Sequence, residues 1–144
     1  MQTEHQIKLE NQLCFSLYAT SKEVIKLYKP LLDTHGLTYT QYIALMVIWE
    51  HEAISVKALG SKLYLDSGTL TPLLKKLELQ GFVTRTRLES DERTVIVAPT
   101  LAGWQLQKDI LTVPESLYCQ LQHTAADLFT LKKQLDLLLE TLVK

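Results

Sequence analysis

Hydrophobic positions in the first part of the chain recur with the period of an amphipathic helix. Two adjacent stripes have spacings of three, four and seven residues, and they predict a helix over about residues 8–32. Adjacent stripes imply a wide buried face, so we expect Cys14 to be buried. Pro30 and Gly36 bracket the predicted exit of this helix. The two stripes are Leu13, Leu17, Val24, Leu27 and Leu31, and Cys14, Tyr18, Ile25 and Tyr28.

A central, buried helix is predicted to follow. Thr38 and Gln41 have the spacing of a capping box, so this helix should begin near Tyr39. Its side chains are apolar on nearly every face, which is typical of a helix surrounded by other elements. Residues 53–56 then predict a short extended link, in which Ser55 can cap the next helix.

The next stretch has the organisation of a helix-turn-helix followed by a hairpin. Two short helical patterns lie only a few residues apart, and the second should be capped by Asp66 or Ser67 and ended by Gly81. Beyond Gly81 the period changes to two. Residues 82–88 and 93–98 therefore predict two strands, joined by the charged turn ESDE.

Leucine dominates the C-terminal part of the chain. Thr100 should cap one helix there, which Pro114 interrupts or restarts. The leucines around and beyond it recur mostly at steps of three and four, close to the seam of a coiled coil, and they require a partner surface. The order of elements predicts a mainly helical α+β fold, a winged helix-turn-helix with a small β hairpin between helices from both ends. The leucines are Leu117, Leu121, Leu128, Leu131, Leu135, Leu138 and Leu142.

Composition narrows the class of protein. The 144 residues suit one domain, and a hydrophobic fraction of 47% is enough for a packed core. The N-terminus has no signal-peptide pattern and no apolar run is long enough to span a membrane, so we expect a cytoplasmic protein. Two cysteines are too few for a disulfide scaffold, and the four histidines lack metal-binding spacing. No metal and no cofactor are expected.

Charge is distributed unevenly. The net charge is −1, but residues 57–93 carry seven basic and five acidic side chains. The segment DSGTLTPLLKK has the small polar donors that a helix needs in the major groove, and arginines on the hairpin suit the minor groove. Each feature alone also suits an ordinary helix cap or a solvated turn, but together they favour binding to double-stranded DNA. The expected contacts are Asp66, Ser67, Thr69, Thr71, Pro72, Lys75, Lys76, Arg85, Arg87 and Arg93.

The stretch LYLDSGTLTPLLKKLELQGFVTRTR, with DERTV after it, resembles the MarR family of bacterial winged-helix regulators. The segment LCFSLYATSKEVIKLYKPLLDTHGLTYTQYIALMVIWE is similar to the N-terminal half of its organic hydroperoxide resistance regulators, and the resemblance covers about residues 10–103. It implies one domain over residues 1–144 with a winged helix-turn-helix core at about 53–98. Dimerisation helices at about 8–32 and 101–143 would form a homodimer on a pseudo-palindromic operator, associated with the nucleoid when bound to DNA.

The resemblance also implies roles for individual residues. Cys14 falls on the family's peroxide-sensing cysteine, Tyr28 and Tyr39 on tyrosines that hydrogen-bond it, and Tyr18 on a further tyrosine near the site. No Lys or Arg lies on the Cys14 face within one helical turn, so hydroxyl donors would have to stabilise a reactive thiolate. Organic hydroperoxides are the implied oxidants.

Two further matches extend this assignment. Asp91 and Arg93 match the acidic-x-basic motif of the wing, which adds Asp91 to the expected DNA-binding residues. Cys119 is like the second cysteine of a two-cysteine subgroup, in which it would form an intersubunit disulfide with oxidised Cys14. A small apolar filler in a leucine-rich helix is the other interpretation of Cys119, and a cellular thiol is the other partner for Cys14.

The function implied by the resemblance is repression of a peroxide-detoxifying gene, relieved when an organic hydroperoxide oxidises the protein. Two alternatives stay open. One is a MarR-type repressor released by a small aromatic ligand, with Cys14 as a packing residue. The other is a thiol peroxidase, although the helix-turn-helix and the hairpin argue against an enzyme.

Overall fold

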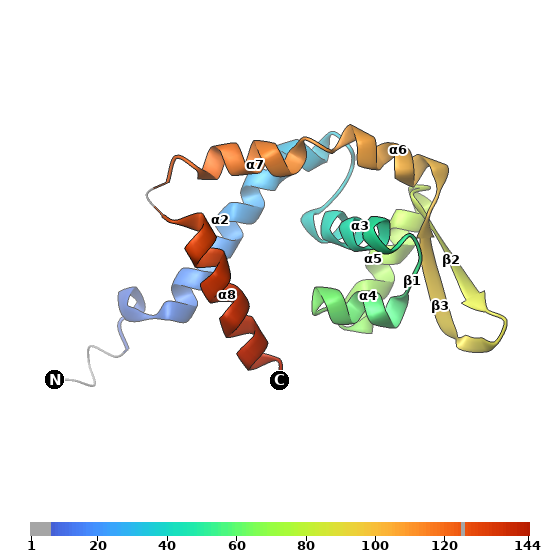
Figure 1. Ribbon diagram of the computed structural model, residues 1–144, viewed down its shortest axis with the longest axis horizontal. Helices are drawn as coiled ribbons and strands as arrows, with labels where there is room; N and C mark the ends of the chain where they lie inside the picture. Colours follow the sequence, from blue (N-terminus) through green and yellow to red (C-terminus); the bar gives the residue numbers. More distant parts are fainter. Residues whose placement is uncertain (1–6, 125) are drawn as a thin grey trace. The chain divides into compact units, whose positions relative to one another are not determined.

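The computed structural model describes residues 7–124 and 126–144. The chain divides into two compact units, one reaching to Leu111 and the other running from Thr112 to Lys144. The first unit holds the helix-turn-helix and the sheet (Figure 1). Its helices are the 3-10 helix η1 (Leu9–Asn11), α2 (Leu13–Asp33), α3 (Tyr39–His51), α4 (Val56–Leu63), α5 (Ser67–Leu79) and α6 (Leu101–Asp109).

Helix α2 is one long helix that continues through Pro30 and ends at Asp33, between Pro30 and Gly36 as predicted. It ends in a Schellman-type turn, in which the Leu37 N–H donates to the Leu32 carbonyl at 3.2 Å and the Gly36 N–H donates to the Asp33 carbonyl at 3.0 Å. Gly36 has a φ of 67°, a left-handed conformation that glycine adopts without a steric penalty. The turn sets the direction in which α3 begins.

Helix α3 begins at Tyr39 with the predicted capping box. The Gln41 N–H donates to the Thr38 hydroxyl at 3.3 Å, and the Thr38 N–H donates to the Gln41 side-chain carbonyl at 2.9 Å. The indole N–H of Trp49 donates to the Gly103 carbonyl at 3.1 Å, which ties α3 to α6. The helix is central, as expected, because its apolar side chains are buried on most of its faces.

The two helices of the helix-turn-helix are capped as the sequence predicts. The Ser55 hydroxyl accepts from the Ala58 N–H at 3.1 Å, and the Asp66 carboxylate accepts from the Thr69 N–H at 2.8 Å. Between them Tyr64 adopts a left-handed conformation with a φ of 57°. The leucines of α5 pack into the core of the unit, and they are Leu70, Leu73, Leu74 and Leu77.

The sheet has three antiparallel strands in the order β1-β3-β2. They are β1 (Ile54–Ser55), β2 (Val83–Leu88) and β3 (Asp91–Pro99), and Figure 1 shows β2 and β3 as an extended hairpin. The sequence predicts only the hairpin. The link expected at residues 53–56 is extended at Ile54 and Ser55, and it also joins the sheet, because Ile54 pairs with Val97.

The second unit holds α7 (Val113–Leu121) and α8 (Leu128–Leu142). Pro114 lies in the first turn of α7, so it restarts a helix, one of the two roles predicted for it. The heptad leucines of α8 are partly exposed, with Leu131, Leu135 and Leu138 at 39%, 38% and 37% exposure. The single domain over residues 1–144 stays a prediction. Within the part of the chain that the structure describes, no helix is long and apolar enough to cross a membrane.

Candidate functional site

Helix α5 presents a polar face opposite its buried leucines. All of its predicted DNA-contacting side chains are exposed: Ser67, Thr69, Thr71, Pro72, Lys75 and Lys76. Small hydroxyl groups lie in the first turns and the two lysines further along, an order that suits base edges first and phosphates next. Their contacts with DNA stay a prediction, but the fold places them on one accessible face.

Asp66 has a structural task at the start of this helix. Its carboxylate caps α5, and the hydrogen bond from the backbone N–H of Thr69 holds the pKa of Asp66 below its usual range. The carboxylate is therefore ionised and directed at the helix start. In the structure it serves to fix α5, and its predicted DNA contact is a second role.

The tip of the β2–β3 hairpin is ordered by Asp91. Its carboxylate accepts from the Arg93 N–H at 3.0 Å and from the Thr94 hydroxyl at 3.1 Å. The Arg87 guanidinium donates to the Glu92 carbonyl at 2.8 Å, which ties β2 to the same tip. Arg93 itself is exposed. The acidic-x-basic motif thus has a physical basis, since the acid holds the turn that displays the arginine.

Arg85 forms an ion pair with Glu78 that the sequence pattern did not reveal. Its guanidinium lies 3.1 Å and 3.4 Å from the two carboxylate oxygens of Glu78, at the last turns of α5. The hydrogen bond from Arg85 also holds the pKa of Glu78 below its usual range. This pair joins strand β2 of the hairpin to helix α5.

Cys14 is exposed in the single chain, so the prediction that it is buried is wrong there. The apolar face of α2 around it is also uncovered, with Leu13 66% and Phe15 41% exposed. Tyr18, one turn further along, is exposed, and the Lys22 ammonium lies 5.0 Å from its ring centroid. Another protein surface would have to cover this face of α2 to bury it. The period of the apolar stripes does not tell which surface that is.

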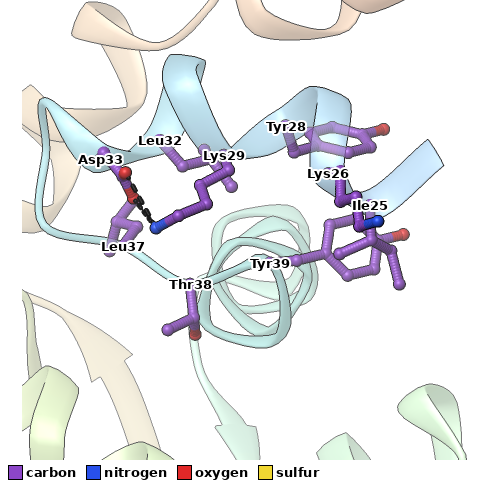
Figure 2. Close-up of a pocket in the computed structure, with 9 residues that line it drawn as sticks. All are labelled: Ile25, Lys26, Tyr28, Lys29, Leu32, Asp33, Leu37, Thr38 and Tyr39. Carbon is purple, nitrogen blue, oxygen red and sulfur yellow. Dashed lines mark hydrogen bonds and ion pairs between the residues drawn. The ribbon is translucent and has the colours of Figure 1, made fainter. Parts of the chain in front are cut away.

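Tyr28 and Tyr39 lie against each other where α2 meets the start of α3 (Figure 2). Their ring centroids are 4.8 Å apart, and Tyr42 adds a third ring 5.7 Å from Tyr28. A pocket of about 240 Å³ opens beside them. Its remaining lining residues are Ile25, Lys26, Lys29, Leu32, Asp33, Leu37 and Thr38, and Lys29 pairs with Asp33 at 3.0 Å.

The tyrosines and Cys14 are far apart within one chain. Cys14 and Tyr28 lie on the same continuous helix, fourteen residues apart. At a rise of about 1.5 Å per residue, roughly 21 Å of helix separates them, well beyond the reach of a tyrosine side chain. Tyr39 packs on Tyr28 and shares its position. The structure therefore does not bring Tyr28 and Tyr39 together with Cys14 of the same chain, whereas Tyr18 lies one helical turn from it.

The second cysteine lies elsewhere in the chain. Cys119 is on α7 in the second unit, and like Cys14 it is free and exposed. Its disulfide with Cys14 stays a prediction. What the structure adds is that the thiol of each cysteine is accessible in the single chain.

Burial changes the acidity of all three clustered tyrosines. It raises the pKa of Tyr28 to about 12, with smaller contributions from Tyr39 and Tyr42. Burial likewise raises the pKa of Tyr39 and of Tyr42. At neutral pH these phenols are protonated, so their O–H groups are available as hydrogen-bond donors. Donors of this kind favour the charged form of an acceptor such as a thiolate.

This acidity yields a pH prediction. In an alkaline titration followed by tyrosinate absorbance, Tyr28→Phe should remove a step near pH 12 that the folded wild-type protein shows. Because the folded-state pKa is raised, the associated stability is present below the pKa of an unfolded tyrosine, about 10, and is lost as the pH rises towards 12. Denaturant-unfolded protein is the control, and an unchanged step near pH 12 in the folded variant would contradict the assignment.

Comparisons with known proteins identify the chain as similar to transcriptional regulators. Residues 26–110 match the family described as transcriptional regulator SarA/Rot. The chain is 52% identical over 136 residues to the organic hydroperoxide resistance transcriptional regulator of Bacillus subtilis, which covers 94% of this chain and 92% of that protein.

Solved structures of similar proteins include DNA complexes. Reduced AbfR bound to DNA has a TM-score of 0.81 and 35% identity over the whole of both chains. Disulfide-formed AbfR has a TM-score of 0.69 and 34% identity, over 99% of this chain and 98% of that chain. AbfR comes from Staphylococcus epidermidis. A mutant MarR of E. coli complexed with operator DNA has a TM-score of 0.80 and 26% identity, over 88% of this chain and 93% of that chain.

Proposed function

Because this chain belongs to the SarA/Rot family of MarR-type transcriptional regulators, we propose that it represses by binding operator DNA and lets go when an organic hydroperoxide oxidises Cys14. The observation that carries the DNA-binding part is the exposed polar face of α5 beside a hairpin whose tip displays Arg93. The sensing part is supported by the accessible Cys14 thiol and by protonated tyrosine donors.

The chemistry of release is a two-electron oxidation of sulfur. The Cys14 thiolate attacks one peroxide oxygen, the O–O bond breaks, and the rest of the peroxide leaves as an alcohol after taking up a proton. The product is a sulfenic acid. A second thiol, that of Cys119 or of a small cellular thiol, then attacks the sulfenic sulfur, forms a disulfide and expels water.

The proposed active form is a homodimer. Within one chain roughly 21 Å of helix separates Cys14 from Tyr28, so donation to the thiolate by Tyr28 or Tyr39 requires those residues of the partner subunit. The uncovered apolar face of α2 and the leucines of α8 supply surface for such an interface. A dimer also places two α5 helices about one turn of duplex apart, ~34 Å, to reach two half-sites.

Operator release tests the proposal. The reduced protein should shift its operator fragment in a gel, and cumene hydroperoxide should abolish that shift until a dithiol reductant restores it. The DNA fragment should come from the region upstream of the gene that encodes this chain, and a scrambled fragment of the same length is the control. A protein that binds the operator equally before and after oxidation would refute the redox switch while leaving DNA binding in place.

A separate measurement addresses the wing. Arg93→Ala should weaken operator binding by roughly tenfold and lower the salt dependence of the binding constant by about one counterion, because one cation is removed from the hairpin tip. Fluorescence anisotropy over a range of salt concentrations measures both effects. Lys26→Ala is the matched control, since this cation lies in an exposed pair with Glu23 on α2. Equal losses in the two variants would argue against a wing contact.

The pocket beside Tyr28 supports a second candidate function, release of DNA by a small aromatic ligand. Its volume of about 240 Å³ and the rings of Tyr28 and Tyr39 suit a small aromatic ligand, while Lys26 and Lys29 are each paired with a carboxylate of α2. In that case a Cys14→Ser variant would keep its full response to the ligand. A response that depends on Cys14 favours the redox mechanism.

A further inference from the structure

The side chain of Gln80 joins two helix ends that are distant in the sequence. Its amide N–H donates to the Gly36 carbonyl at 2.7 Å, and its carbonyl accepts from the Gln41 side-chain amide at 3.4 Å. Gln80 caps the C-terminal end of α5, Gly36 lies in the turn after α2, and Gln41 lies in the first turn of α3. One side chain thus connects the α2–α3 turn to the DNA-facing helix.

Gln41 makes this connection sensitive to displacement. Its residue is 1% exposed, and its side-chain amide is shared between the Thr38 backbone and Gln80. Separating a buried amide from its partner costs free energy until another group or water replaces the hydrogen bond. Gln41 and Gln80 should therefore move together or separate altogether, which is the behaviour of a two-state contact.

Both ends of the connection are stiff. Helix α5 ends in a Schellman-type turn like that of α2, in which the Phe82 N–H donates to the Leu77 carbonyl and the Gly81 N–H to the Glu78 carbonyl, each at 3.0 Å. Gly81 has a φ of 83°. Because backbone hydrogen bonds fix both turns, we expect a shift of the α2–α3 turn to displace the end of α5 through the Gln80 side chain.

The turn is also part of the tyrosine cluster. Leu37, Thr38 and Tyr39 lie between Gly36 and Gln41, and all three line the pocket beside Tyr28. Figure 2 shows Thr38 and Tyr39 at the start of α3, directly below α2. Any event that moves the Tyr39 ring against Tyr28 acts on the backbone that Gln80 holds.

We propose that Gln41 and Gln80 form a positioning pair that transmits displacement of the α2–α3 turn to the DNA-reading helix α5. This rests on the proposed function, which supplies both the event at the tyrosines and the DNA at α5. Neither glutamine lines the pocket, and the link to it runs through Thr38, which lines the pocket and shares two hydrogen bonds with Gln41. Their role is to make the orientation of α5 depend on the arrangement of the tyrosine cluster.

The test measures how strongly oxidation changes operator affinity. Gln80→Met removes both hydrogen bonds while keeping a side chain of similar length. The ratio of operator dissociation constants, hydroperoxide-oxidised over reduced, should fall at least about fivefold in Gln80→Met. The Gln41→Met,Gln80→Met double variant should show no further fall, because the pair acts as one unit. Gln105→Met is the matched control, since the Gln105 side chain donates to Asp109 on its own helix.

A second variant protects the test against misfolding. Gln80→Glu keeps an acceptor for Gln41 but donates nothing to Gly36, and its affinity ratio should fall as well. If both Gln80 variants keep the wild-type ratio of operator dissociation constants and show only a lower melting temperature, the positioning pair does not transmit displacement. Its hydrogen bonds then serve only to stabilise the fold. The proposed function fails separately. A wild-type protein that keeps its operator after oxidation overturns both proposals. Gln80 variants that no longer release the operator after oxidation, beside a wild-type protein that does, overturn neither.

Discussion

Cys14→Ser protein should stay on its operator in a concentration of organic hydroperoxide that releases the wild-type protein. A serine hydroxyl is not ionised at neutral pH and does not reduce peroxides, so the first oxidation step is lost. Coupling between two sites of a regulator commonly changes affinity by about 5- to 150-fold. We therefore expect a clear release of wild-type protein in a gel-shift titration with cumene hydroperoxide, and no change in the Cys14→Ser lane.

Cys119→Ser is the matched control for this experiment. Both cysteines are exposed thiols in the chain, so a general loss of thiol would affect the two variants alike. If Cys119 resolves the oxidised Cys14, its variant should form no cross-linked dimer on a non-reducing gel and should lose full, reversible release. Release of the Cys14→Ser variant by hydroperoxide would remove Cys14 as the sensor. A Cys119→Ser variant with full, reversible release would instead favour a cellular thiol as the partner.

The features of the fold that are encoded locally were predictable. Thr38 with Gln41, Ser55, Asp66 and Thr100 all cap helices in the structure, as their spacing predicted. A helix cap depends on residues three positions apart, so both partners of the interaction can be recognised in a short stretch of sequence. The same holds for the exposed polar face of α5, which follows from the helical period.

Features that depend on distant partners were not predictable. Strand β1 exists because Ile54 pairs with Val97, and nothing in a short extended link reveals that partner. The burial expected for Cys14 assumed that the apolar face of α2 is covered by the same chain, and the structure leaves it exposed. An apolar stripe predicts that a face will be covered without saying which molecule covers it.

The connections that matter most for the proposed switch have no local signal either. Glu78 meets Arg85 across the end of α5 and the start of the hairpin, and Gln80 reaches Gly36 over 44 residues of sequence. Glu78 and Gln80 look like ordinary polar surface positions when only their neighbours in the sequence are considered. Only the three-dimensional arrangement shows that they fix how α5 is held.

The leucine stripe of α8 is the surface that we most expect to form the interface between subunits. Leu131, Leu135 and Leu138 lie on one face of the helix and are each more than a third exposed in the single chain. Leu137 lies on the opposite side of the same helix and is 64% exposed. Since α8 belongs to a unit of only thirty-three residues, its apolar face needs more surface than a lone helix provides. We expect the stripe, and not the whole helix surface, to form the subunit interface.

Leu135→Asp should convert the protein to a monomer and weaken operator binding by at least about 100-fold. A carboxylate placed in an apolar interface loses its hydration without gaining a partner, and a monomer can reach only one half-site. Analytical ultracentrifugation measures the first effect and fluorescence anisotropy with the operator measures the second. Leu137→Asp introduces the same charge on the same helix, two residues away, and should leave both properties within about twofold of wild type. A dimeric Leu135→Asp protein, or equal losses in the two variants, would show that the leucine stripe is not the interface and that the subunits associate elsewhere.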